Sequence, residues 1–245
     1  MKILGVIPAR YASTRFPGKP LAMIKGKPMV QRVYEQASKA NLTEVVVATD
    51  DDRIAEVVRG FGGNVVMTSA DHPSGTDRCA EAMAKYKSGW DAVINIQGDE
   101  PYIHPNQINI LAEILQREEV EIGTLIKKIS HTEELLNVNT PKVVINEKGE
   151  ALYFSRQPIP YKKGEEVTEW VNHHTYYKHI GIYGYKASVL PKLTQLKQSS
   201  LEIAESLEQL RWLENGYRIA TGITVEETLA VDTPDDLLKA QSIDL

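Results

Sequence analysis

The sequence begins with MKILGVIPARYASTRFPGKP over residues 1–20. Residues 3–7 form an apolar run with the length of a buried β-strand, and the chain continues from it into a loop that carries Arg10, Arg15 and Lys19. Ligands of open α/β sheets bind beyond the carboxyl ends of the strands. The stretch therefore predicts a strand of such a sheet, with a cationic loop at the edge where a ligand would bind.

Downstream of this loop, short apolar runs alternate with stretches that carry apolar residues at helical spacing. The runs of strand length are residues 45–48, 65–67, 92–96 and 122–129, and the helical stretches are residues 28–40, 52–59, 76–87 and 105–118. Strands separated by helical crossovers form parallel sheets that are covered on both faces. We therefore predict a Rossmann-like, doubly wound α/β fold with a mostly parallel sheet and helices on both faces.

The second half of the chain has a different pattern. Residues 142–145 and 151–155 flank a four-residue loop that ends in Gly149, which is typical of a β-hairpin. We expect one domain over residues 1–245, with a hairpin or arm inserted around residues 142–176. The remaining expected elements are a strand over residues 176–185, a helix over residues 201–214 and a final helix that begins at the N-cap Thr233.

Composition limits the class of protein. The 245 residues are 42% hydrophobic and 25% charged, as in ordinary globular proteins, and the net charge of −5 argues against a general nucleic-acid binder. The single cysteine, Cys79, excludes an intramolecular disulfide framework and suits a reducing compartment, where we expect it to pack in a helix. With no signal peptide and no apolar run of membrane-spanning length, we expect a cytoplasmic protein without membrane contact.

The loop after the first strand has the composition of a polyphosphate site. Arg10, Arg15 and Lys19 place three positive charges within ten residues. The small residues Ala9, Ser13 and Gly18 let backbone N–H groups approach an anion. A triphosphate fits this charge best, the alternative being a solvated basic loop. Neither the P-loop motif nor the dinucleotide-binding glycine motif is present, so phosphate binding would follow another design.

Eight motifs in order along the chain resemble one known family. They are IPARYASTRFPGKPL, VVVATDD, ADHPSGTDR, NIQGDEP, ALYFSRQPIP, HIGIYGY, LEQLRWLENG and VDTPDDL. Together they are similar to the CMP-Kdo synthetase (3-deoxy-manno-octulosonate cytidylyltransferase) family of sugar-acid cytidylyltransferases. The resemblance implies transfer of CMP from CTP to the sugar acid 3-deoxy-D-manno-octulosonate (Kdo), with release of pyrophosphate. It also implies a homodimer and a product that is used in lipopolysaccharide assembly.

The motif QGDEP places Asp99 just beyond the strand at residues 92–96, on the same sheet edge as the cationic loop. Mg²⁺ takes hard oxygen ligands, commonly one or two carboxylates together with substrate phosphates. The resemblance implies that Asp99 is the primary Mg²⁺ ligand and that Asp232 completes the site. We expect in-line attack of the sugar hydroxyl on the α-phosphorus, with Arg10, Arg15, Lys19 and Asp99 as the catalytic residues.

The remaining site residues are assigned to the two substrates by resemblance. Ser74 and Gly75 match nucleotide contacts, along with Ala9, Arg10, Ser13, Arg15 and Lys19, although helix capping explains Ser74 almost as well. The sugar residues would be Gln97, Arg156, His179, Tyr183, Glu208 and Gln209. The alternatives are the same chemistry on 8-amino-8-deoxy-Kdo or a sialic acid, and a non-catalytic nucleotide-sugar sensor.

Overall fold

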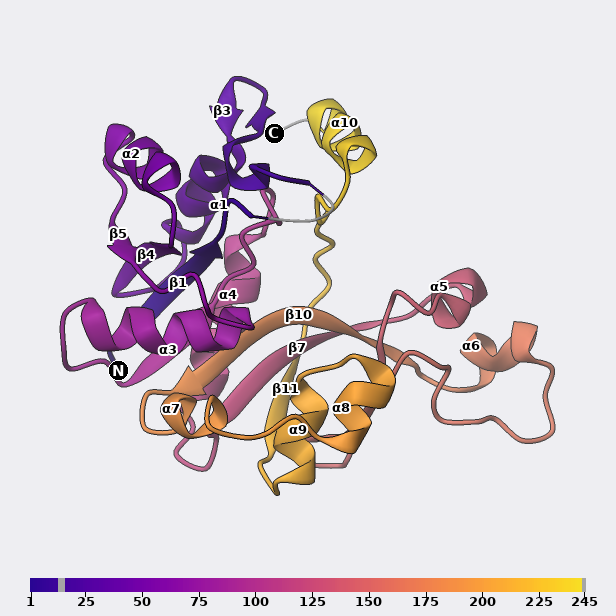
Figure 1. Cartoon of the computed structure of the whole chain (residues 1–245). Coiled ribbons are helices and arrows are strands. Elements are labelled where there is room, and N and C mark those ends of the chain that lie inside the picture. The colour runs from indigo at the N-terminus through magenta and orange to yellow at the C-terminus, as the bar shows by residue number, and fades with distance from the viewer. Residues whose placement is uncertain (13–15, 244–245) are drawn as a thin grey trace.

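A central sheet organises the computed structural model, which describes residues 1–12 and 16–243 (Figure 1). Within these residues the sheet has nine strands, seven of them in the order β11-β7-β10-β6-β1-β4-β5. The strands are β1 (Ile3–Ala9), β4 (Glu44–Thr49), β5 (Val65–Met67), β6 (Ala92–Asn95), β7 (Ile122–Lys128), β8 (Lys142–Ile145), β9 (Ala151–Ser155), β10 (Tyr177–Lys186) and β11 (Ile219–Ile223). A separate two-stranded ribbon pairs β2 (Met23–Ile24) with β3 (Lys27–Pro28).

The sheet is mixed, with β10 as its reversed strand. Strand β1 pairs in parallel with β4 and β6, β4 with β5, and β7 with β11. Strand β10 runs antiparallel to both β6 and β7, and so it joins the two parallel halves. The prediction of a mostly parallel α/β sheet is confirmed.

Helices cover both faces, because side chains along each strand alternate between two apolar cores. Ile3 and Ile7 of β1 point into the core shared with helices α1 (Met29–Ala37), α2 (Asp52–Gly60) and α4 (Pro105–Gln116). Leu4 and Val6 point into the opposite core, shared with α3 (Gly75–Lys85), α7 (Leu190–Leu193) and α9 (Gln209–Glu214). Cys79 of α3 is fully buried in that second core, as a helix-packing residue.

The hairpin in the second half is confirmed, and it extends the main sheet. Strands β8 and β9 pair antiparallel, and β8 also pairs with β10. Beyond the hairpin, helices α5 (Thr132–Leu136) and α6 (Trp170–His173) lie at one end of the molecule, next to the 3₁₀ helix η2 (Val167–Glu169) (Figure 1). They share a small core formed by Ile129, Leu135, Trp170 and Tyr176.

The expected single helix over residues 201–214 is wrong. Two helices occupy this stretch, α8 (Ser200–Glu205) and α9, because Ser206 has a left-handed backbone with φ of 51°. The Arg156 guanidinium donates to the carbonyl oxygens of Glu205 (2.7 Å) and Ser206 (3.3 Å) and so satisfies the end of α8. Strand β11 was not predicted from the sequence.

The last helix, α10 (Pro234–Ser242), begins as predicted at Thr233. The Thr233 hydroxyl accepts from the backbone N–H of Asp236, whose carboxylate accepts in turn from the Thr233 N–H. Figure 1 shows α10 next to the β2–β3 ribbon, at the end of the sheet where β1 leads into the cationic loop. No helix within the described residues is long and apolar enough to cross a membrane.

Candidate functional site

A pocket of about 250 Å³ lies at the carboxyl ends of β1 and β6. Its walls come from the loop after β1, the turn before α3, the loop after β6 and the segment before α10. The lining residues are Pro8, Arg10, Lys19, Pro20, His72, Pro73, Ser74, Gly75, Arg78, Gln97, Gly98, Asp99 and Asp232. This is the sheet edge that the sequence predicted for ligand binding.

Two glycines shape the backbone of the loops at the pocket. A Cβ on Gly98 would lie 2.5 Å from the backbone oxygen of Pro8, so only glycine lets the loop after β6 approach the end of β1 this closely. Gly18 has a φ of 71° and its N–H donates to the carbonyl of Tyr11 (2.9 Å), which closes the cationic loop. Lys19 then begins the 3₁₀ helix η1 (Lys19–Leu21), whose first residue lines the pocket.

Lys19, Asp99 and Asp232 form the charged centre of the pocket. The Lys19 ammonium donates to Asp99 Oδ2 at 2.8 Å and to Asp232 Oδ1 at 3.3 Å. The N–H of Val231 donates to the Asp99 carbonyl at 2.8 Å, which holds the segment before α10 against the loop after β6. Two carboxylates from distant parts of the chain therefore meet at one cation.

Glu100 lies behind this centre and was not predicted. Its side chain is buried, and burial, reinforced by the charge of Asp99, raises the pKa of Glu100 to about 7. Thr228 donates a hydrogen bond of 3.2 Å to its carboxylate. The acidic pair in QGDEP thus divides into an accessible carboxylate, Asp99, and a buried one beneath it.

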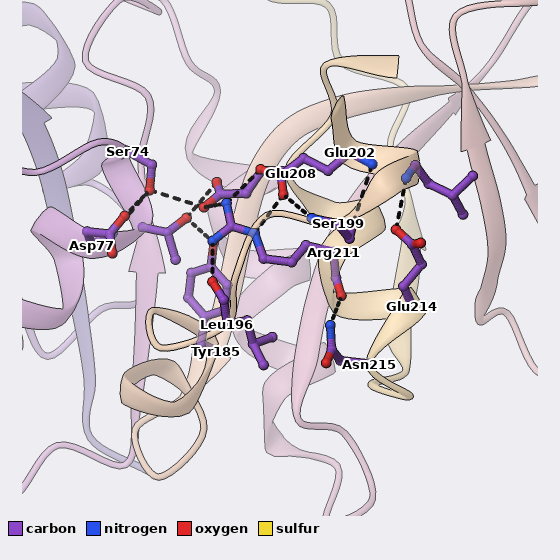
Figure 2. Close-up of polar contacts among 12 residues, drawn as sticks. Ser74, Asp77, Tyr185, Leu196, Ser199, Glu202, Glu208, Arg211, Glu214 and Asn215 are labelled. Atoms are coloured by element: carbon purple, nitrogen blue, oxygen red, sulfur yellow. Dashed lines mark hydrogen bonds and ion pairs between the residues drawn. The ribbon is translucent and has the colours of Figure 1, made fainter. Parts of the chain in front are cut away.

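The turn at Ser74 and Gly75 combines helix capping with pocket lining. Ser74 is the N-cap of α3, and its hydroxyl is within 2.6 Å of Asp77 Oδ2 and 3.1 Å of Glu208 Oε1 (Figure 2). The capping interpretation of Ser74 is confirmed, and the same residue lines the pocket, where a nucleotide contact stays a prediction. A Cβ on Gly75 would lie 3.4 Å from Asn95, so this turn sits directly on the end of β6.

Four of the predicted sugar residues lie in β10 or at the start of α9, whereas Gln97 follows β6 and Arg156 follows β9. Among these six predicted residues, Gln97 alone lines the pocket. Gln97 donates to the carbonyl of Gly181 (2.7 Å). His179 Nε2 is 3.0 Å from the Thr124 hydroxyl, and desolvation lowers the pKa of His179 to about 3, so the imidazole is neutral.

Tyr183 and Gln209 are polar residues that lie almost completely buried. Their side chains are 8% and 5% exposed. Neither the Tyr183 hydroxyl nor Gln209 Nε2 has a hydrogen-bond partner within residues 1–12 and 16–243. Because buried polar groups are normally satisfied, such atoms indicate a place where a polar ligand or water binds.

Three further predicted residues have other surroundings. Ala9 is buried in the core beneath the loop. The donors of Arg156 are directed to backbone carbonyls, including that of Val138 at 3.1 Å. Glu208 faces the Ser74 turn (Figure 2). Ser13 and Arg15, both predicted to bind the nucleotide, lie outside the described residues.

Two polar residues that line the pocket, His72 and Arg78, were not predicted from the sequence. The Arg78 guanidinium is buried and donates to the Thr68 hydroxyl (2.6 Å), while His72 Nε2 contacts the carboxylate of Glu81. Arg78 follows Ser74 by four residues, so one turn of helix places both on the same side of α3. That spacing within ADHPSGTDR was the available signal.

Comparisons with known proteins identify the family of this chain. A family model described as cytidylyltransferase matches residues 4–219. The chain is 58% identical to the 3-deoxy-manno-octulosonate cytidylyltransferase of Parabacteroides distasonis, over 98% of this chain and 97% of the relative. It is also 58% identical to the enzyme of that name from Cytophaga hutchinsonii, over 98% of this chain and 96% of the relative.

Among solved structures, CMP:2-keto-3-deoxy-manno-octonic acid synthetase complexed with CTP superposes with a TM-score of 0.91. The two sequences are 45% identical, over 99% of this chain and 98% of that one. With the family model, these matches show that the chain belongs to the cytidylyltransferase family and, within it, to the group of 3-deoxy-manno-octulosonate cytidylyltransferases.

Proposed function

We propose that this chain transfers CMP from CTP to the anomeric hydroxyl of Kdo and releases pyrophosphate. The observation that carries the proposal is the pocket at the end of β1 and β6, where Lys19 meets Asp99 and Asp232 beside the Ser74 turn. The similarity to a synthetase solved with CTP covers nearly the whole chain.

We also propose that Asp99 and Asp232 hold Mg²⁺. Both carboxylates reach the same Lys19 ammonium, so their oxygens already converge on a single cation, and carboxylate oxygens are the ligands that Mg²⁺ prefers. When bound, Mg²⁺ would neutralise charge on the phosphates of CTP. In its presence, Lys19 would be free to bind a phosphate oxygen.

The residues of the chain supply binding, orientation and charge. Arg10 and Lys19 line the pocket and would stabilise the negative charge that gathers on the departing pyrophosphate. Ser74 and Gly75 form the opposite wall, where a nucleoside would lie. Nucleotide contacts from Ala9, Ser13 and Arg15 remain part of the proposal, Ala9 through its backbone. Positioning the two substrates for in-line attack would provide much of the rate enhancement.

The sugar acid would bind between β10 and α9, next to the pocket. Tyr183 and Gln209 offer buried polar atoms without hydrogen-bond partners in the part of the chain that the structure describes, which matches the many hydroxyls of Kdo. Gln97 connects this region to the pocket, because it lines the pocket and donates to Gly181 of β10. Arg156, His179 and Glu208 complete the proposed set of sugar residues.

The assay of this proposal uses the purified chain with CTP and Mg²⁺, and a panel of Kdo, 8-amino-8-deoxy-Kdo and a sialic acid. Pyrophosphate release is measured, and the nucleotide sugar is identified by mass spectrometry. We expect CMP-Kdo to be the preferred product. Preference for another acid would correct the substrate. A folded protein that binds CTP but forms no product with any of the three acids would refute the activity and favour a sensor.

We further propose a homodimer that works in the cytoplasm and supplies lipopolysaccharide assembly. Leu152 of β9 and Ile203 of α8 are 60% and 65% exposed, and such large apolar side chains suit an interface with a second copy. The free thiol of Cys79 suits a reducing compartment. Light scattering at micromolar concentration should give twice the mass of one chain. A Leu152→Glu and Ile203→Glu double variant should give the mass of one chain.

A further inference from the structure

Arg211 of α9 is held from several sides by groups on neighbouring segments (Figure 2). Its guanidinium makes a bidentate ion pair with Glu202, with Nε 2.8 Å from Oε2 and Nη2 2.6 Å from Oε1. Nη1 donates to the carbonyl of Leu196 at 3.1 Å. The side chains of Arg211 and Glu202 are only 12% and 8% exposed. This pair therefore locks α9 against α8 in one orientation.

The same guanidinium also lies beside Glu208, at the start of α9. Nη2 of Arg211 is 3.8 Å from Glu208 Oε1. The pKa of the Glu208 carboxyl is raised overall by burial. Hydrogen bonds from Thr76 and Ser74 and the positive charge of Arg211 offset part of this increase. Arg211 thus supplies the fixed positive charge next to a carboxylate that is partly removed from solvent.

Both oxygens of Glu208 are used by the first turn of α3. Glu208 Oε1 accepts from the Ser74 hydroxyl at 3.1 Å, and Oε2 accepts from the Thr76 hydroxyl at 2.9 Å. These contacts join segments 134 and 132 residues apart. Since Ser74 lines the pocket, one carboxylate connects α9 with the wall of the nucleotide site.

We propose that Arg211 is a positioning residue for nucleotide binding: it orients Glu208, which in turn fixes the Ser74 turn that lines the pocket. The Ser74 hydroxyl has a single proton and two carboxylate acceptors within reach, Glu208 and Asp77. Without the positive charge of Arg211 at 3.8 Å, the Glu208 carboxylate competes less well with Asp77 for that proton, and the link between the turn and α9 weakens. The inference rests on the proposed function only in assigning the pocket to CTP.

The first experiment measures CTP affinity by calorimetry on the full chain, with thermal unfolding as a check of folding. We expect Arg211→Met to weaken CTP binding about tenfold, since it removes the positive charge 3.8 Å from Glu208, whose carboxylate accepts the hydrogen bonds from Ser74 and Thr76. Arg211→Lys, which keeps the charge, should recover affinity to within about threefold of wild type. The matched control is Glu214→Gln in the same helix, which loosens contacts to Ser200 and Leu201 but does not touch Glu208.

The decisive measurement is a double-mutant cycle between Arg211→Met and Ser74→Ala. If Arg211 acts through Ser74, the double variant should bind CTP no more weakly than the weaker of the two single variants. Losses that multiply would mean a general structural role for Arg211 and would overturn the proposal, as would wild-type affinity in Arg211→Met. Should Arg211→Met fail to fold, Arg211→Gln, which removes the charge but keeps hydrogen-bond donors, takes its place in the same cycle, with the same expectations.

This experiment separates the inference from the proposed activity. Calorimetry reports CTP binding whether or not a product forms. A chain that binds CTP and shows the expected cycle, but makes no nucleotide sugar, would refute the proposed transfer and leave the role of Arg211 standing. A chain that makes CMP-Kdo, but in which the losses of affinity multiply, would support the proposed transfer and refute the role of Arg211.

Discussion

Replacing Asp99 by asparagine is expected to reduce turnover strongly while changing the stability of the fold only slightly. The neutral amide keeps the size of the side chain but removes one of the two carboxylates that meet at Lys19. The Asp99 and Lys19 side chains are 29% and 16% exposed. At 2.8 Å the pair is worth about 6 kcal/mol with an effective dielectric constant near 20, before desolvation.

Only a small part of that Coulomb energy contributes to the free energy of unfolding. Solvent-accessible ion pairs contribute about 0–1 kcal/mol, and the substitution also relieves repulsion between Asp99 and Asp232. We therefore expect the unfolding free energy to change by less than about 1 kcal/mol. Turnover should fall by at least about 100-fold, or about 2.7 kcal/mol in activation free energy, because the proposed Mg²⁺ site loses a ligand.

The assay compares initial rates of pyrophosphate release over a range of Mg²⁺ concentrations, with urea unfolding measured on the same samples. The matched control is Asp91→Asn, just before the opposite end of β6, where the carboxylate accepts from the N–H of Lys2 at 2.6 Å. The control should keep full turnover. Wild-type rates in Asp99→Asn at all Mg²⁺ concentrations would refute the metal assignment, and loss of folding would refute the view that this pair is dispensable for stability.

Three other predictions follow from buried groups. Lys142→Met should lower the unfolding free energy by about 2–4 kcal/mol in urea, since the fully buried ammonium donates to three backbone carbonyls, and an unchanged midpoint would contradict this. The His179 imidazole, whose pKa is about 3, should not titrate by NMR between pH 5 and 8, and stability should fall below pH 6.5 because only the unfolded chain gains that proton. The buried Cys79 thiol, whose pKa is raised by burial, should react with a thiol reagent only after unfolding.

Elements with strong local signals were predicted correctly. Helix α10 begins at Thr233 because a threonine cap, a proline in the first turn and Asp236 act within a few residues of one another. The same is true of the hairpin around Gly149, whose φ of 74° suits a turn that glycine adopts readily. Such signals depend on the backbone geometry of neighbouring residues, which the sequence contains directly.

The break between α8 and α9 could not be predicted in this way. Leucines at helical spacing continue through the stretch, but Arg156, about fifty residues earlier, donates to the carbonyls where α8 ends. Strand β11 was missed for a related reason, since its partner β7 lies about a hundred residues before it. Contacts between distant segments decided both elements, and no local pattern reports such contacts.

At the site, too, some features follow from local sequence and others from contacts between distant segments. The order of the amino acids is enough to show which charges are present, that Lys19 follows the first strand and that Asp99 follows another strand of the same sheet. Folding brings Asp232 to Lys19 across 213 residues, and among the described residues it leaves polar atoms of Tyr183 and Gln209 buried without partners. Charge and hydrophobic periodicity can be read from neighbouring residues in the sequence. Burial and contacts between distant charged residues form only when the chain folds and its core packs.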